Sequence, residues 1–162
     1  MSVIEEWSEF HVAMAGATAA LAGLVIVAAS VNIAEIVKSR TLTSRLLAGI
    51  AALLLALTVS ALGLVPRIDD TWFGALTILA ALVAVVFQVN TTWLIARDRS
   101  PADRAKPLKY VIGFLPIAAY LAAGTALLMR HPSGMYFAAA GCVLAVVSAV
   151  VVSWVALVEV LR

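Results

Sequence analysis

Apolar and polar residues follow one another along this chain in long blocks. Five apolar blocks are separated by four short polar connectors, and each block is close to or above the about 20 residues that a helix needs to cross a bilayer. The blocks are residues 10–37, 44–65, 72–96, 108–129 and 135–161. The pattern predicts an all-α, polytopic helical membrane protein, with residues 1–162 forming a single domain of five transmembrane helices.

The composition supports this prediction. Hydrophobic residues make up 64% of the 162 residues and charged residues 12%, whereas a soluble domain has roughly 45–50% and about 25%. A chain this short has no soluble core large enough for so much apolar surface, so we expect the lipid bilayer to be its main partner. The net charge of +2 does not indicate nucleic acid, and the single cysteine excludes a disulfide within the chain.

The basic residues predict the orientation. If the connectors alternate between the two sides of the membrane, nine of the eleven Lys and Arg residues fall on one side, and only Arg67 and Arg130 fall on the other. An excess of Lys and Arg marks the cytoplasmic side, so the prediction is N-out/C-in. Anionic lipid headgroups would be attracted to these cytoplasmic loops. The nine residues are Lys38, Arg40, Arg45, Arg97, Arg99, Arg104, Lys106, Lys109 and Arg162.

Every predicted helix carries a stripe of small or polar residues, which in lipid allows two helix backbones to approach closely. These stripes are interpreted as packing seams, with a water-filled path between several of them as the alternative. The first block has small or polar residues on several faces and is predicted to be the central helix, either surrounded by protein or shared with a second subunit. The main packing positions are Gly16, Ala20, Gly23, Gly49, Gly63 and Gly141.

Polar residues gather at the predicted cytoplasmic ends of three blocks. The carboxylates are expected to reach headgroup water or to pair with nearby basic residues, and the amides to hydrogen-bond between helices. The functional alternative is an inner vestibule or a lipid-headgroup site where the first predicted helix meets the third. The candidate cluster is Asn32, Glu35, Gln88, Thr92 and Glu159.

Motifs of catalysis and cofactor binding are not found in the sequence, and the connectors are too short to build an active site outside the membrane. We therefore expect no enzyme, no cofactor and no metal site. His11 and His131 do not have the spacing of a metal-ligand motif and are interpreted as solvated residues. Cys142 is interpreted as a small buried apolar residue.

The first block reads FHVAMAGATAALAGLVIVAASVNIAEIV. Its Phe, its Gly/Ala-rich run and the following GLxxVAxSxN pattern resemble the first helix of small uncharacterised bacterial multi-span membrane proteins. The resemblance implies a multi-pass protein of the bacterial inner (plasma) membrane. The resemblance does not imply any activity or any site residues.

Small-residue seams on every predicted helix favour a protein that works in an assembly. The leading hypothesis is an accessory or structural subunit of a membrane protein complex, or a self-associating membrane protein. The alternative is an oligomeric ion channel or small transporter lined by the first and third predicted helices.

Overall fold

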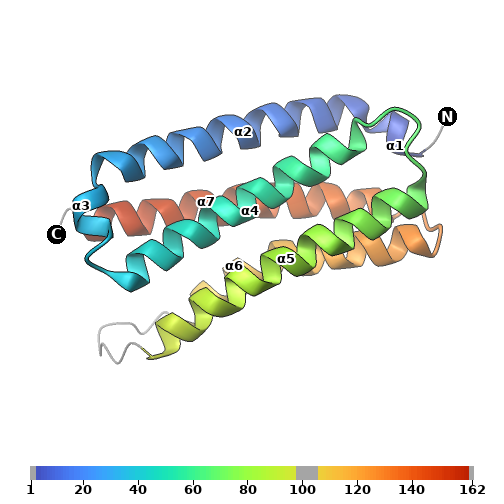
Figure 1. Ribbon diagram of the computed structural model, residues 1–162. Helices are drawn as coiled ribbons and strands as arrows, with labels where there is room; N and C mark the ends of the chain where they lie inside the picture. The colour runs from blue at the N-terminus through green and yellow to red at the C-terminus, as the bar shows by residue number, and fades with distance from the viewer. Residues whose placement is uncertain (1–2, 98–105, 161–162) are drawn as a thin grey trace.

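The protein is a bundle of long helices joined by short connections. The computed structural model describes residues 3–97 and 106–160, and the first and the last of the described residues lie at opposite ends of the bundle (Figure 1). Five of the helices are long and apolar enough to cross a membrane, which confirms the prediction of five such helices. The elements are α1 (Val3–Glu6), α2 (Ser8–Val31), α3 (Ile33–Ile36), α4 (Arg40–Gly63), α5 (Asp70–Arg97), α6 (Lys106–Leu128) and α7 (Gly134–Val160).

The first predicted block is interrupted at Asn32. Helix α2 ends at Val31, and one further turn, α3, leads into α4. The Asn32 amide nitrogen donates to the Ala28 carbonyl at 3.4 Å, and asparagine side chains weaken helices by competing for backbone groups. The Ser39 hydroxyl then accepts a hydrogen bond from the Leu42 N–H at 3.3 Å and caps α4.

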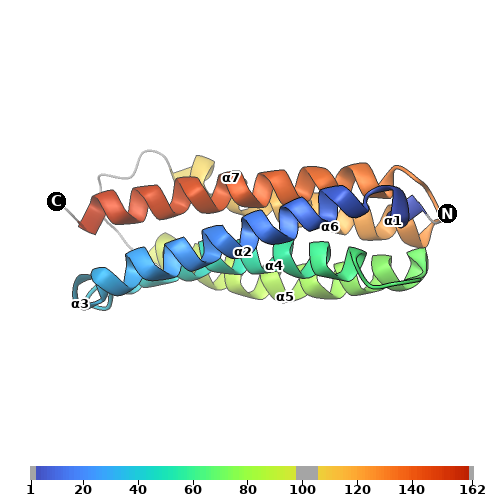
Figure 2. The same ribbon diagram turned by 90° about the horizontal axis from the view of Figure 1, so that it is seen from above.

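Helix α4 is the centre of the bundle. It packs along α2 on one side and along α5 and α7 on the other, and α6 fills the space between α5 and α7. In Figure 1, α2 lies at the edge of the bundle and α4 lies between α2 and α5, and in Figure 2, seen from above, α2 crosses in front of α4. In an apolar stretch of 18 residues within each helix, 44% of the residues of α4 are buried, against 11% of those of α2. The prediction that the first block forms the central helix is therefore wrong.

The core contains a buried polar contact among three helices. The Tyr120 hydroxyl of α6 donates to the Cys142 sulfur of α7 at 3.0 Å, and the Ser60 hydroxyl of α4 lies 3.5 Å from the same sulfur. All three side chains are buried. Cys142 is buried as predicted, but it also joins a polar network rather than acting only as a small apolar residue.

His11 is not the solvated residue that the sequence suggested. Only 1% of it is exposed, and its ring packs between Phe10 and Phe73, with ring centroids 6.0 and 5.9 Å away. Gly63 makes this possible, because a Cβ at that position would lie 2.5 Å from two atoms of the His11 ring. The other histidine, His131, is exposed as expected.

Candidate functional site

Helix α2 has two different faces. Thr18 and Ala22 point into the bundle and are buried, together with His11 near the start of the helix. Gly16, Ala20 and Gly23 are exposed. At about 100° per residue, Gly16 lies roughly 160° around the helix from Thr18. The small residues that the sequence marked as a packing stripe therefore form the outward face of α2.

The glycines of the chain confirm that this face has no partner within the described residues. Seven of the nine glycines lie so close to a neighbouring helix or side chain that an added Cβ would meet other atoms within 4 Å. Gly16 and Gly23 would meet nothing within that distance. Gly124, in contrast, lies against α5, where a Cβ would be 2.7 Å from the Gly74 carbonyl oxygen.

The packing positions singled out from the sequence therefore fall into two classes. Gly49 lies against Ala149 and Ser153 of α7, and Gly141 lies against the Tyr120 ring. Gly63 accommodates the His11 ring. These three are seams inside the bundle. Gly16, Ala20 and Gly23 are not, and we name them the α2 outward face.

The polar residues predicted to cluster do not come together as one group. Asn32 is half-buried at the end of α2, and Glu35 is exposed and pairs with Lys38 at 2.6 Å. Gln88 and Thr92 lie on α5, on the far side of α4 from α2. Glu159 lies near the end of α7, and its side chain is outside the described residues. Helices α2 and α5 come together at the opposite end of the bundle, where His11 meets Phe73.

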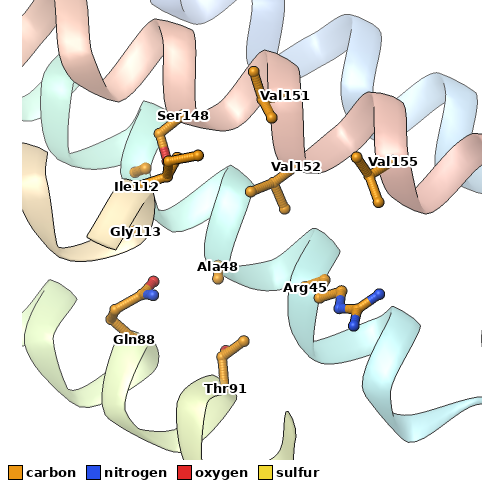
Figure 3. Close-up of a pocket in the computed structure, with 11 residues that line it drawn as sticks. Arg45, Ala48, Gln88, Thr91, Ile112, Gly113, Ser148, Val151, Val152 and Val155 are labelled. Carbon is orange, nitrogen blue, oxygen red and sulfur yellow. The ribbon is translucent and has the colours of Figure 1, made fainter. Parts of the chain in front are cut away.

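A cavity lies between α4, α5, α6 and α7, towards the end of the bundle where α4 begins. It has an empty volume of about 640 Å³, part of it open to the surroundings. We name it the Arg45 cavity after the arginine that lines one end of it. Only 8% of Arg45 is exposed. Figure 3 shows Arg45 on α4, Gln88 and Thr91 on α5, and three valines on α7 around it. The lining residues are Arg45, Ala48, Ala52, Gln88, Thr91, Ile112, Gly113, Ser148, Val151, Val152 and Val155.

The polar groups of the cavity differ in how they are bonded. The Thr91 hydroxyl lies 3.1 Å from the Ser44 carbonyl oxygen and 3.0 Å from the Phe87 carbonyl oxygen, and it can donate a hydrogen bond to either. The Gln88 amide makes no side-chain hydrogen bond within residues 3–97 and 106–160. It packs directly on Gly113, where a Cβ would overlap the amide. Gln88 was singled out from the sequence, but Arg45 was counted only among the basic residues on the predicted cytoplasmic side.

Side chains that could bind a metal ion do not form a cluster in the described parts of the chain. Among the residues that the structure describes, no group of three or more His, Cys, Asp or Glu side chains is placed to hold a metal ion. In the described parts of the chain, the α2 outward face and the Arg45 cavity are the two features that we consider further.

The family model described as "Family of unknown function (DUF7994)" matches residues 1–103. The chain belongs to this family. No curated protein and no solved structure matches the chain.

The DUF7994 match covers the two features unequally. The whole of the α2 outward face lies within residues 1–103, and so does the wall of the Arg45 cavity that α4 and α5 provide. The wall from α6 and α7, including Ser148 and Val151, lies outside the matched residues.

Proposed function

We propose that this DUF7994 protein is a multi-pass membrane protein that self-associates through the α2 outward face. In this proposal it is a structural subunit of a membrane assembly and not an enzyme. The observation that carries the proposal is the exposure of Gly16, Ala20 and Gly23 on a helix that could span a membrane.

The physics of helix association in lipid supports this proposal. Lipid tails are as apolar as leucine, so transmembrane helices associate where small side chains let backbones approach. Gly49, Gly74 and Gly124 lie at such contacts, because a Cβ there would meet backbone atoms of a neighbouring helix within 4 Å. A small-residue face turned towards lipid provides the shape for the same contact, but no neighbouring helix in the described parts of the chain packs against it.

A second copy of the chain is the occupant that fits this face best. A two-fold axis brings the same patch of both subunits together, so the patch must complement itself. Gly16, Ala20 and Gly23, at spacings of four and three residues, can complement themselves in this way. Their side chains are too small to keep the two helix backbones apart. The face also carries no charge, since no Asp, Glu, Lys or Arg occurs between Glu9 and Glu35.

We further propose that the protein lies in a bacterial inner membrane with its N-terminus outside and its C-terminus in the cytoplasm. The support is the charge bias of the connectors, in which nine of eleven basic residues fall on the side of the C-terminus. A reporter fused after Arg162 is expected in the cytoplasm, and one inserted after Asp70 is expected outside.

The alternative function, a channel or transporter lined by the first and third predicted helices, has less support. Helix α4 lies between α2 and α5, so these two helices do not face each other along a path within one subunit. Ion or dye flux through liposomes containing the pure protein, lost on Gln88→Leu, would favour this alternative over a structural role.

The oligomeric state of the purified protein tests the proposal. We expect wild-type protein in mild detergent to have the mass of a dimer, and the double variant Gly16→Leu/Gly23→Leu to have the mass of a monomer. The matched control is Ala118→Leu, because Ala118 is exposed at mid-span on α6. The control should remain dimeric.

Two outcomes would contradict self-association. One is a monomeric wild-type protein in both detergent and liposomes. The other is a dimer that survives the double substitution but dissociates in Ala118→Leu. If the wild-type protein instead purifies from its native membrane in fixed ratio with a different subunit, the α2 outward face serves a hetero-complex and the second-copy proposal is wrong.

A further inference from the structure

The Arg45 cavity carries polar groups of three helices near Gly113. We propose that this part of the cavity is a hydration site for ordered water molecules. The waters hydrogen-bond to the Gln88 amide of α5, the Ser148 hydroxyl of α7 and the Ile112 carbonyl of α6. The hydration site lies inside one subunit and does not depend on the α2 outward face.

Two side chains bring polar groups to the hydration site. Figure 3 shows the Gln88 amide and the Ser148 hydroxyl pointing into the cavity from opposite walls. Only 5% of Ser148 is exposed. Within residues 3–97 and 106–160, neither side chain makes a hydrogen bond. A polar group in an apolar environment is costly unless it is bonded, so both groups require a partner that the cavity can hold.

A proline adds a third polar group, from the backbone of α6. Pro116 lies inside this helix and has no N–H. The Ile112 carbonyl, four residues earlier, therefore lacks the hydrogen bond that a helix normally provides. Ile112 lines the cavity beside Gly113. Transmembrane helices tolerate proline where side chains or ordered waters bond the freed backbone group, which is the role that the hydration site gives to its waters.

The cavity has room for these waters. A water-sized sphere can be centred within about 70 Å³ of it, and one water requires about 10–15 Å³ measured in this way. A buried water typically makes about three hydrogen bonds. Gln88, Ser148 and the Ile112 carbonyl are three groups that can form them, and they come from three different helices.

Water suits these groups better than the oxygens of a lipid. The Gln88 side chain has both an N–H₂ donor and a carbonyl acceptor, and the Ser148 hydroxyl can also donate and accept. Ester and phosphate oxygens only accept, so the Gln88 carbonyl oxygen would still have no donor. Water donates and accepts, so it can satisfy both ends of the amide.

Nuclear magnetic resonance of the full chain in phosphatidylcholine nanodiscs tests the proposal. The probe is water itself, and the readout is cross-relaxation between water protons and the side-chain amide protons of Gln88. Laboratory-frame and rotating-frame signals of opposite sign identify a bound water, whereas proton exchange gives the same sign in both. We expect a bound-water signal at Gln88 and none at Asn90, an exposed amide on the same helix.

Three variants identify the groups that hold the water. Ser148→Ala removes one partner, and Pro116→Ala supplies the N–H that can bond the Ile112 carbonyl directly, so we expect the Gln88 signal to fall in both. Ser153→Ala is the matched control on α7. Ser153 is also 5% exposed, but it lies against Gly49 and does not line the cavity. The control should keep the wild-type signal.

The absence of a bound-water signal at Gln88 in the wild-type protein would overturn the proposal, and this measurement needs no variant. Signals from lipid acyl protons at Gln88 in place of water would assign the cavity to a lipid and also overturn it. An unchanged signal in both Ser148→Ala and Pro116→Ala would show that these groups do not hold the water, with the same consequence.

Discussion

Helices α2 and α4 have the same length of 24 residues and carry two glycines each, yet they use them in opposite ways. In α4, Gly49 lies against α7 and Gly63 against the His11 ring of α2. In α2, Gly16 and Gly23 meet no other part of the described chain. The glycines of α4 are explained by packing inside one subunit, whereas those of α2 are the ones that we propose to pack against a second subunit.

This comparison gives a graded set of predictions. The closer the atoms that a new side chain would meet, the larger the expected loss of stability. Stability is measured for each variant as the free energy of unfolding in mixed micelles, with tryptophan fluorescence or circular dichroism as the readout.

The largest effect is expected for Gly124→Leu. A Cβ at Gly124 would lie 2.5 Å from the Ile78 Cγ1 and 2.7 Å from the Gly74 carbonyl oxygen. Because backbone cannot rotate away as a side chain can, α5 and α6 must separate, and we expect a loss of about 3 kcal/mol. Ala118→Leu, on the exposed side of the same helix, should unfold like the wild type. If the two variants behave alike, the close contact between α5 and α6 does not exist.

The next effect is expected for Gly63→Ala. Its Cβ would lie 2.5 Å from the His11 ring, and we expect a loss of about 2 kcal/mol. A double-mutant cycle isolates the cause, because in a His11→Ala background the ring is gone and the same substitution should cost much less. An equal cost in both backgrounds would show that the clash with His11 is not the reason.

A smaller effect is expected for Gly141→Ala. Three atoms of the Tyr120 ring lie 3.1 Å from the position of the new Cβ, so the ring must move by a few tenths of an ångström. We expect a loss of about 1 kcal/mol. Ala140→Leu changes the exposed neighbouring residue of α7 and serves as the control. An unchanged unfolding curve for Gly141→Ala would mean that the Tyr120 ring shifts without cost.

The smallest effect on the monomer is expected for Gly23→Ala. Nothing lies within 4 Å of its Cβ position, and alanine favours a helix over glycine by about 0.8–1.0 kcal/mol. Measured at a dilution where the protein is monomeric, its stability should therefore be equal to or slightly above that of the wild type. A loss similar to that of Gly63→Ala would show that the α2 outward face is already packed within the chain.

The sequence predicted the five long helices because hydropathy depends on local composition, and the polar connectors mark where each block ends. It could not show which helix is central. Gly16 and Gly63 have the same side chain, and only the positions of the other helices distinguish an open face from a filled one. For the same reason His11 was assigned to solvent, since its burial depends on Gly63 and Phe73, which are far away in the sequence.

The candidate site was predicted only in part. Gln88 was singled out because an amide at membrane depth is conspicuous in an apolar block, and it does line the Arg45 cavity. Thr92 was singled out for its hydroxyl on the same ground, but it is not among the residues that line the cavity. Arg45 was counted only among the basic residues that set the orientation, and its burial depends on how α4 packs against its neighbours. Asn32 and Glu35 were placed with Gln88 because depth along the membrane can be read from sequence, whereas the side of the bundle cannot.

Cysteine cross-linking in native membranes tests the central claim about the α2 outward face most directly. A disulfide forms only when the two Cα atoms are within about 7 Å. In a Cys142→Ala background, Ala20→Cys is expected to give a covalent dimer on oxidation, and Ala118→Cys is expected to remain monomeric. Absence of the Ala20→Cys dimer, together with a dimer formed by Ala118→Cys, would contradict the account.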